Sequence, residues 1–365
     1  MRKRRYIVKR FCNISASAVA ALLGVRLETR KLNIVKDENC KHFLTNQIRL
    51  YILLHFYANS NNGITPVMSI KELSDKLSCH EKTIMRSFEL LAKENMLSIL
   101  DTPEPGYVTV QILNITKMYQ RLGEGGKGYI TCSIEEFEPI LKIKETAKLR
   151  AVLIGLLEFT SRSFLSASKA IGYITLKIDT IKQAFPNSAR PSDIRSAING
   201  ESAFMVLFDR TDTHMKKSIS VKLKDEFNAK TIKQKIRIDA KRSIFSFIDK
   251  VNEIIHDVNI GIHEDGIVHI HDASALLKQG IDIFDKMDLI HPNKIPLLDI
   301  QSSVKQDCIT IAQDYGIDSI LDALRIYYMN YALPGTFTKN KNASLGGLIR
   351  NIVYEMFLSP SNSLK

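Results

Sequence analysis

The sequence predicts an α+β, helix-rich fold with several domains, and three observations lead to this prediction. The chain has 365 residues, more than one hydrophobic core usually organises. Helical spacing of apolar residues recurs along the chain and is interrupted by short β-rich runs next to turn residues. The net charge also changes sign: from Ser243 onward there are 10 Lys and Arg against 15 Asp and Glu, and before it 41 against 24. The basic and acidic parts are therefore expected to be different domains.

The basic part has a net charge of 41 − 24 = +17, and the acidic part has 10 − 15 = −5. A positive field of this size attracts polyanions, of which nucleic acid is the commonest inside cells. Lys-rich surfaces also occur simply because they keep proteins soluble. Composition alone leaves these two interpretations open.

Composition also indicates the cellular compartment. Hydrophobic residues make up 45% and charged residues 25% of the chain, as in ordinary soluble proteins. No apolar run reaches the roughly 18 residues that a membrane span needs, so we expect no membrane partner. The cysteines lie far apart with no CxxC pair, which is typical of a reducing compartment, and we expect a cytoplasmic protein.

Residues 41–125 show the clearest succession of elements. Apolar spacing over residues 44–60 predicts a helix with a wide buried face. A break follows, and Ser69 with Glu72 forms the pattern of a capping box that begins a second helix. This helix is expected to end near Leu77.

A third helix and a hairpin complete this region. The helix is predicted to begin near His80 and to end at Asn95, a residue that tolerates the left-handed conformation of a helix terminus. Its apolar positions predict the buried face: Ile84, Phe88 and Leu91. Two β-rich runs around a Pro/Gly turn follow within residues 96–113, which predicts a hairpin.

Three helices followed by a hairpin is the order of a winged helix-turn-helix domain. The stretch "ELSDKLSCHEKTIMRSFELLAKENML" (residues 72–97) resembles this family, although Ser78 stands where a turn glycine is common. The resemblance implies that the third helix enters the DNA major groove and that the hairpin, the wing, lies by the phosphates. The candidate DNA-binding residues on its free side are then His80, Lys82, Thr83 and Arg86. Many winged helices bind proteins instead.

Residues 126–242 are predicted to contain a second, winged-helix-like copy. The expected order is an apolar helix, a strand, two short helices and a hairpin: 144–164, 171–178, 179–188, 190–203 and 203–223. Pro191 fits the first turn of the second short helix, where its missing N–H costs nothing. The alternative is an α+β domain whose hairpin happens to be basic.

This second copy supplies further candidate DNA-binding residues. The groove-facing candidates are Arg190, Ser192, Arg195 and Ser196. The second wing is expected to contribute Arg210, Lys216 and Lys217. A basic tail follows over residues 216–242, with ten Lys and Arg against three Asp and Glu. This tail either contacts phosphates or forms a solvated helix face.

The two ends of the chain differ in character. Residues 1–40 are interpreted as a basic arm and leading segment, which either reaches along DNA or is solvated. Residues 243–365 are predicted to form an acidic, α-rich domain for self-association, giving a homodimer, or for a protein partner. Within it, we interpret His263, His269 and His271 as polar residues at a sheet edge rather than as metal ligands.

No pattern in the sequence predicts catalysis. There is no phosphate-binding GxxxxGK[ST] loop and no nucleophile elbow. We therefore expect no cofactor, no metal and no enzymatic activity.

The tandem organisation, with a basic front and a separate helical end, resembles the replication initiators of plasmids and phages. That resemblance implies sequence-specific binding to repeated double-stranded DNA sites through two winged helices. Two alternatives stay open: a transcriptional repressor of a mobile element, and a winged-helix scaffold that binds proteins and no DNA.

Overall fold

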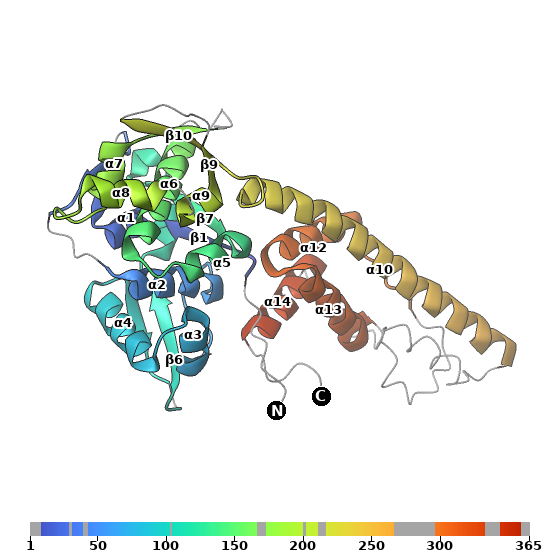
Figure 1. Cartoon of the computed structure of the whole chain (residues 1–365). Coiled ribbons are helices and arrows are strands. Elements are labelled where there is room, and N and C mark those ends of the chain that lie inside the picture. Colours follow the sequence, from blue (N-terminus) through green and yellow to red (C-terminus); the bar gives the residue numbers. More distant parts are fainter. Residues whose placement is uncertain are drawn as a thin grey trace. The chain divides into compact units, whose positions relative to one another are not determined.

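The computed structural model describes residues 9–28, 31–38, 43–102, 104–165, 173–199, 202–210, 217–265, 296–332 and 344–358. It is an α+β fold in which helices predominate and the sheets are small and antiparallel, as predicted (Figure 1). Contacts within the chain divide it into two compact units, Lys9–Ile232 and the part from Lys233 onward. Helix α10 (Ala229–Asp265) continues through Arg242 and Ser243, where the change of charge had suggested a boundary.

The large unit begins with a strand, a helix and a small hairpin: β1 (Phe11–Ser15), α1 (Ala16–Leu23), β2 (Val25–Leu27) and β3 (Ile34–Lys36). We expected this region to be a leading segment, but from Phe11 onward it is part of a core. Gly24 ends α1 in the left-handed conformation, with φ of 68°. The most basic part of the expected arm, Met1–Val8, lies outside the described residues.

A first module (residues 45–112) follows the predicted order and adds one short strand. Its elements are α2 (Thr45–Tyr57), β4 (Met68–Ser69), α3 (Ile70–Leu77), α4 (Glu81–Lys93), β5 (Leu97–Leu100) and β6 (Tyr107–Ile112). The three strands form an antiparallel sheet in the order β4-β6-β5. Figure 1 shows α2, α3 and α4 grouped around β6.

The predicted start of α3 and the predicted end of α4 are confirmed by the backbone. The hydroxyl of Ser69 accepts a hydrogen bond from the backbone N–H of Glu72 at 3.4 Å, which satisfies an N–H at the start of α3. Asn95 has φ of 55°, the left-handed conformation expected just beyond α4. The backbone N–H of Met96 then bonds the carbonyl of Leu91 at 3.0 Å, closing the end of the helix.

A second module (residues 146–223) repeats this order with one additional helix. Its elements are α6 (Thr146–Leu165), β8 (Ile174–Lys177), α7 (Ile178–Gln183), α8 (Pro191–Ile198), α9 (Ala203–Leu207), β9 (Phe208–Arg210) and β10 (Ser218–Leu223). The sheet order β8-β10-β9 places the first strand beside the third, as β4-β6-β5 does in the first module. Pro191 occupies the first turn of α8, as predicted.

One element of the second module differs from the prediction. Residues 203–207, expected to belong to a strand of the hairpin, form helix α9, and the strand is confined to Phe208–Arg210. The hydroxyl of Ser202 accepts from the backbone N–H of Met205 at 3.5 Å and so caps α9. Phe204 and Phe208 stack with ring centroids 4.7 Å apart, which anchors the short helix to the strand that follows it.

A strand and a helix also precede the second module: β7 (Tyr129–Ser133) and α5 (Ile134–Lys142), which correspond to β1 and α1. β1 and β7 pair antiparallel, with Cys12 opposite Cys132 and Asn13 opposite Thr131. The hydroxyls of Thr45 and Thr146, each at the start of its helix, are hydrogen-bonded at 2.8 Å. Equivalent elements that pair with each other indicate an approximate two-fold relation between the halves, as in a symmetric dimer interface.

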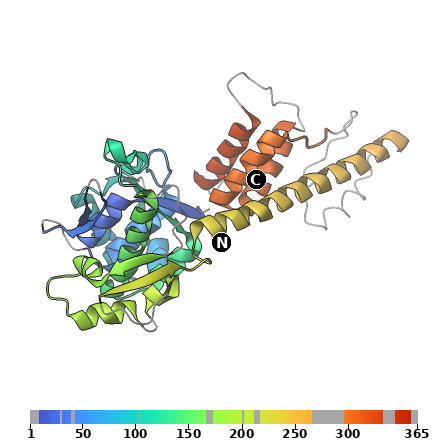
Figure 2. The ribbon, with the colours of Figure 1, turned by 90° about the horizontal axis from the view of Figure 1, so that it is seen from above.

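The described part of the unit from Lys233 onward is mainly helical. It contains most of α10 together with α12 (Ser302–Tyr315), α13 (Ile317–Tyr327) and α14 (Leu345–Leu358) (Figure 2). Apolar side chains of α10, among them Ile244, Val251 and Ile255, share one core with those of the other three helices. No helix in the described ranges is both long and apolar enough to cross a bilayer.

Candidate nucleic-acid interface

Helix α4 separates an apolar side from a polar side as the sequence predicts. Ile84, Phe88 and Leu91 are fully buried. Lys82 and Arg86 are exposed, and neither has an ion-pair partner among the described residues. Both cations are therefore available to a polyanion.

The other two candidates on α4 have additional structural roles. His80 is the N-cap residue, and its Nδ1 accepts from the backbone N–H of Lys82 at 3.3 Å. Thr83 is only partly exposed, and its backbone carbonyl accepts from the hydroxyl of Ser87 at 2.7 Å. His80 and Thr83 thus help to build the start of the helix, whereas Lys82 and Arg86 extend from it.

The turn between α3 and α4 contains the departure from the winged-helix pattern. Ser78 adopts the left-handed conformation, with φ of 49° and ψ of 49°, in which glycine is more common. The backbone N–H of Cys79 bonds the carbonyl of Ser74 at 3.1 Å, and the hydroxyl of Ser74 donates to the Cys79 carbonyl at 2.6 Å. These bonds keep the tight turn although its central residue has a side chain.

Substitution of Ser78 should reveal this conformational requirement. Ser78→Val should lower the free energy of unfolding by about 1–2 kcal/mol, since a β-branched residue is strongly disfavoured at positive φ. Ser78→Gly removes the same hydroxyl but fits the turn, so it should leave stability unchanged or slightly higher. Chemical denaturation followed by circular dichroism measures both. Equal destabilisation by the two variants would instead assign the effect to the lost hydroxyl.

Helix α8 presents a comparable face. Ile194, Ala197 and Ile198 are buried, whereas the four candidates are exposed: Arg190, Ser192, Arg195 and Ser196. Asp193 accepts from the backbone N–H of Arg190 at 2.9 Å and so fixes the start of the helix. Its carboxylate lies on the same side as Ser192, whose hydroxyl donates to it at 3.4 Å. This face therefore has two cations and one nearby acid.

The two hairpins differ in charge. The first carries exposed Asp101 and Glu104 next to its turn, so the tip of this expected wing would repel phosphates. In the second, Arg210 is exposed at the end of β9 and donates to the side chain of Asn199 at 3.4 Å, and Lys217 is exposed just before β10. Lys216 lies outside the described residues. Among the described residues, exposed cations that can meet phosphates occur in the second hairpin and not in the first.

Two buried arginines at equivalent positions were missed in the sequence. Arg49 of α2 donates through Nη2 to the Leu77 carbonyl at the end of α3, at 2.6 Å. Arg150 of α6 donates through Nη1 to the Ala184 carbonyl at the end of α7, at 2.7 Å. Burial lowers the pKa of both guanidiniums. Each arginine ties the long helix of its module to the helix that precedes the candidate DNA-contacting helix.

The two buried arginines share a short sequence pattern. Each lies one helical turn after a threonine at the start of an otherwise apolar helix, in "TNQIR" and "TAKLR". A charged residue inside an apolar helical run is buried only when its donors find acceptors.

The remaining sequence hypotheses concern residues at the C-terminal end. The side chains of His263, His269 and His271 fall outside the described part of the structure.

Comparison of the sequence with known protein families and with characterised proteins found no match.

Proposed function

We propose that this chain is a sequence-specific double-stranded DNA-binding protein with two winged-helix modules, and that it initiates replication of a plasmid or phage-like element. The observation that carries the proposal is that both modules contain a helix, a strand, two helices and two strands in this order, with the same sheet order; the second module adds α9 before its last two strands. In each module, the second of the paired helices buries an apolar side and exposes cations.

The chemistry of DNA fits these two faces. The major groove admits one α-helix, and the N-terminal part of that helix then lies closest to the base edges. Lys82 and Arg86 belong to the N-terminal half of α4. In α8, Arg190 is the N-cap residue and Arg195 lies in the last turn of this short helix. Phosphate contacts would position the protein, and a small number of base contacts would supply sequence preference.

The two-fold relation between the halves supports binding by one chain at two places on DNA. Equivalent helices related by a two-fold axis can meet successive turns of one duplex, as the helices of dimeric helix-turn-helix proteins do. The unit from Lys233 onward has its own core and would serve homodimer assembly or a protein partner. This separation of tasks suits an initiator, which must both bind DNA and assemble.

Two experiments test the proposal and its alternatives. A reporter plasmid that carries repeated DNA sequences from the neighbourhood of the coding region should replicate only when the full chain is present. If the chain binds those repeats without supporting replication, and represses a promoter next to them, it is a repressor. If it binds no duplex DNA at all, the winged-helix modules serve protein contacts.

Lys82 and Arg86 should behave differently when each is replaced by alanine. A guanidinium can make a bidentate contact to guanine worth about 1–3 kcal/mol of discrimination, so Arg86→Ala should relax preference at one or two base positions. Lys82, nearer the helix start, should meet a phosphate as a point charge. Lys82→Ala should therefore weaken all sequences alike and reduce the salt slope by about 1.

Binding of each variant to a panel of duplexes with single base changes would measure this difference. Lys93→Ala removes an exposed cation from the last turn of the same helix and is the matched control. If Arg86→Ala weakens every duplex equally, α4 makes no base contact. The helix with Arg190 and Arg195 would then be the better candidate.

A further inference from the structure

A cavity of about 640 Å³ lies in the large unit beside the turn that joins α3 to α4. It is lined by the first turns of α2, the end of α3 and its turn, the last turn of α5 and the segment that leads into α6. This volume falls within the range of small-molecule sites in proteins. None of the candidate DNA-binding side chains lines it.

The lining is rich in positive charge. Arg49, Lys76, Lys142 and Lys144 contribute cations, and Glu138 is the one acidic residue among the lining residues. Neither Lys142 nor Lys144 has an acidic partner within the described ranges. A cavity whose walls carry an excess of one charge sign concentrates ions of the opposite sign.

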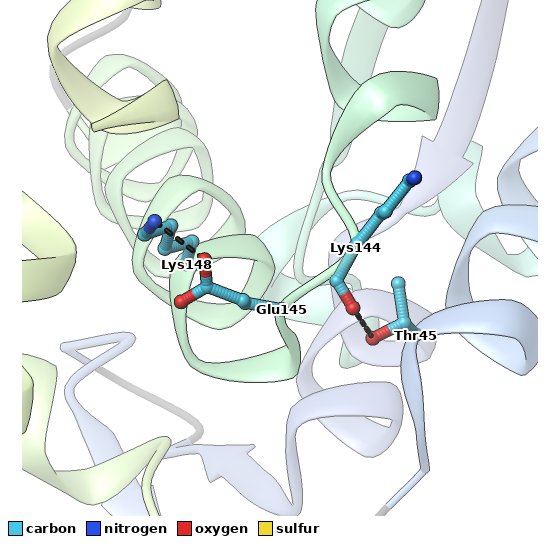
Figure 3. A network of polar contacts seen from close by, with 4 residues as sticks. All are labelled: Thr45, Lys144, Glu145 and Lys148. Carbon is cyan, nitrogen blue, oxygen red and sulfur yellow. Dashed lines mark hydrogen bonds and ion pairs between the residues drawn. The ribbon is translucent and has the colours of Figure 1, made fainter. Parts of the chain in front are cut away.

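Figure 3 shows that the acid next to Lys144 in the sequence pairs with another lysine. The neighbouring Glu145 is paired with Lys148 at 2.6 Å, and the side chain of Lys144 extends away from that pair. The backbone carbonyl of Lys144 accepts from the hydroxyl of Thr45 at 3.2 Å, which fixes this segment against the start of α2. This hydrogen bond therefore fixes the backbone that carries the ammonium group of Lys144.

Arg49 provides the second, independent observation. Only 5% of this residue is exposed, and it lines the cavity. One of its nitrogens donates to the Leu77 carbonyl, but its Nε is buried without an acceptor among the described residues. Buried donors are nearly always paired, and a phosphate oxygen that enters the cavity would supply the acceptor that this N–H lacks among the described residues. The first turn of α2, which includes Asn46, adds partial positive charge at the same wall.

We propose that this cavity binds a small ligand with one or more phosphate groups. Phosphate oxygens match an arginine and several lysines because they accept many charge-assisted hydrogen bonds at once. The buried position of Arg49 favours a compact ligand over the backbone of duplex DNA, which cannot follow a side chain into a cavity. The inference does not depend on the proposed DNA binding, because it uses a different surface of the first module.

Calorimetric titration of the full chain with pyrophosphate, at constant ionic strength, tests the inference directly. Lys142→Gln and Lys144→Gln should each weaken binding about fivefold, and the double variant about 25-fold, since removing one charge at ~4 Å in water changes an affinity by roughly that factor. Glu138→Gln removes the repulsive charge and should tighten binding by a similar factor. Lys93→Gln, an exposed lysine outside the cavity, should have no effect.

The opposite signs expected for Glu138 and the lysines distinguish this site from general attraction to a basic protein. Absence of binding at millimolar pyrophosphate would overturn the inference, and so would binding that Lys93→Gln weakens as much as Lys142→Gln. A competing duplex separates the two sources of phosphate. If duplex DNA displaces pyrophosphate and the double variant loses both ligands equally, the cavity belongs to a DNA contact and the small-ligand assignment is wrong.

Discussion

Raising the salt concentration from roughly 50 to 200 mM should weaken binding of the chain to duplex DNA by roughly 10³ to 10⁵-fold, as expected for six to ten phosphate contacts. The described candidate faces already offer six exposed cations: Lys82, Arg86, Arg190, Arg195, Arg210 and Lys217. Because Arg86 is expected at a base, the other five at phosphates would contribute a slope of log affinity against log salt of about −4.5. Fluorescence anisotropy with a labelled duplex at several salt concentrations measures this slope.

A fragment that ends at Ile232 is the matched control for the salt experiment. It keeps both modules and removes the unit from Lys233 onward, whose described residues form a separate core. The fragment should retain the salt slope for a single site while losing the oligomeric state of the full chain, measured by light scattering. An affinity that stays flat across the salt range would rule out phosphate neutralisation. A fragment that assembles like the full chain would rule out the assembly role.

Much of the first module could be predicted because its local signals agree with its fold. The apolar positions of α4 follow helical spacing, and Ser69 and Asn95 mark helix ends by their own chemistry. Exposure of Lys82 and Arg86 then follows from the burial of the opposite side. The candidate DNA face could be found from sequence for this reason.

Elements that depend on distant partners could not be predicted in the same way. β4 is a strand only because Met68 and Ser69 pair with β6, and two residues carry no periodic signal. The strand β1 is fixed by pairing with β7, far along the chain. α9 has an apolar composition that also suits a strand, and its helical state is decided by the cap from Ser202 and the stacking of Phe204 on Phe208.

The approximate two-fold relation was visible only in part from sequence. The order of elements suggested a second copy. The contact between the two copies depends on polar side chains, and the spacing of apolar residues does not show which polar side chains are buried. The hydroxyls of Thr45 and Thr146 meet each other, and Arg150 reaches the backbone carbonyl of Phe43, just before α2. Such contacts follow from the arrangement of the two halves, which no local pattern encodes.

Arg150→Met should lower the free energy of unfolding of the large unit by about 2–5 kcal/mol. Only 2% of Arg150 is exposed, and its guanidinium donates to the carbonyls of Ala184 and Phe43 at 2.7 and 2.9 Å. Methionine fills a similar volume but leaves both buried carbonyls without these donors, at a cost of about 1–3 kcal/mol each. Relief from burying a charge offsets part of this loss.

Two comparisons make the Arg150 experiment specific. Arg49→Met removes one described carbonyl contact, at Leu77, and should cost about 1–3 kcal/mol, less than Arg150→Met. Arg195→Met changes an exposed arginine of the same module and should stay within about 0.5 kcal/mol. Urea denaturation followed by circular dichroism gives all three values. If Arg150→Met is no more harmful than Arg195→Met, the guanidinium does not hold α6 to its neighbours. If the predicted order holds, the larger loss at Arg150 agrees with its additional contact to the Phe43 carbonyl, which joins a side chain of the second module to the segment just before α2.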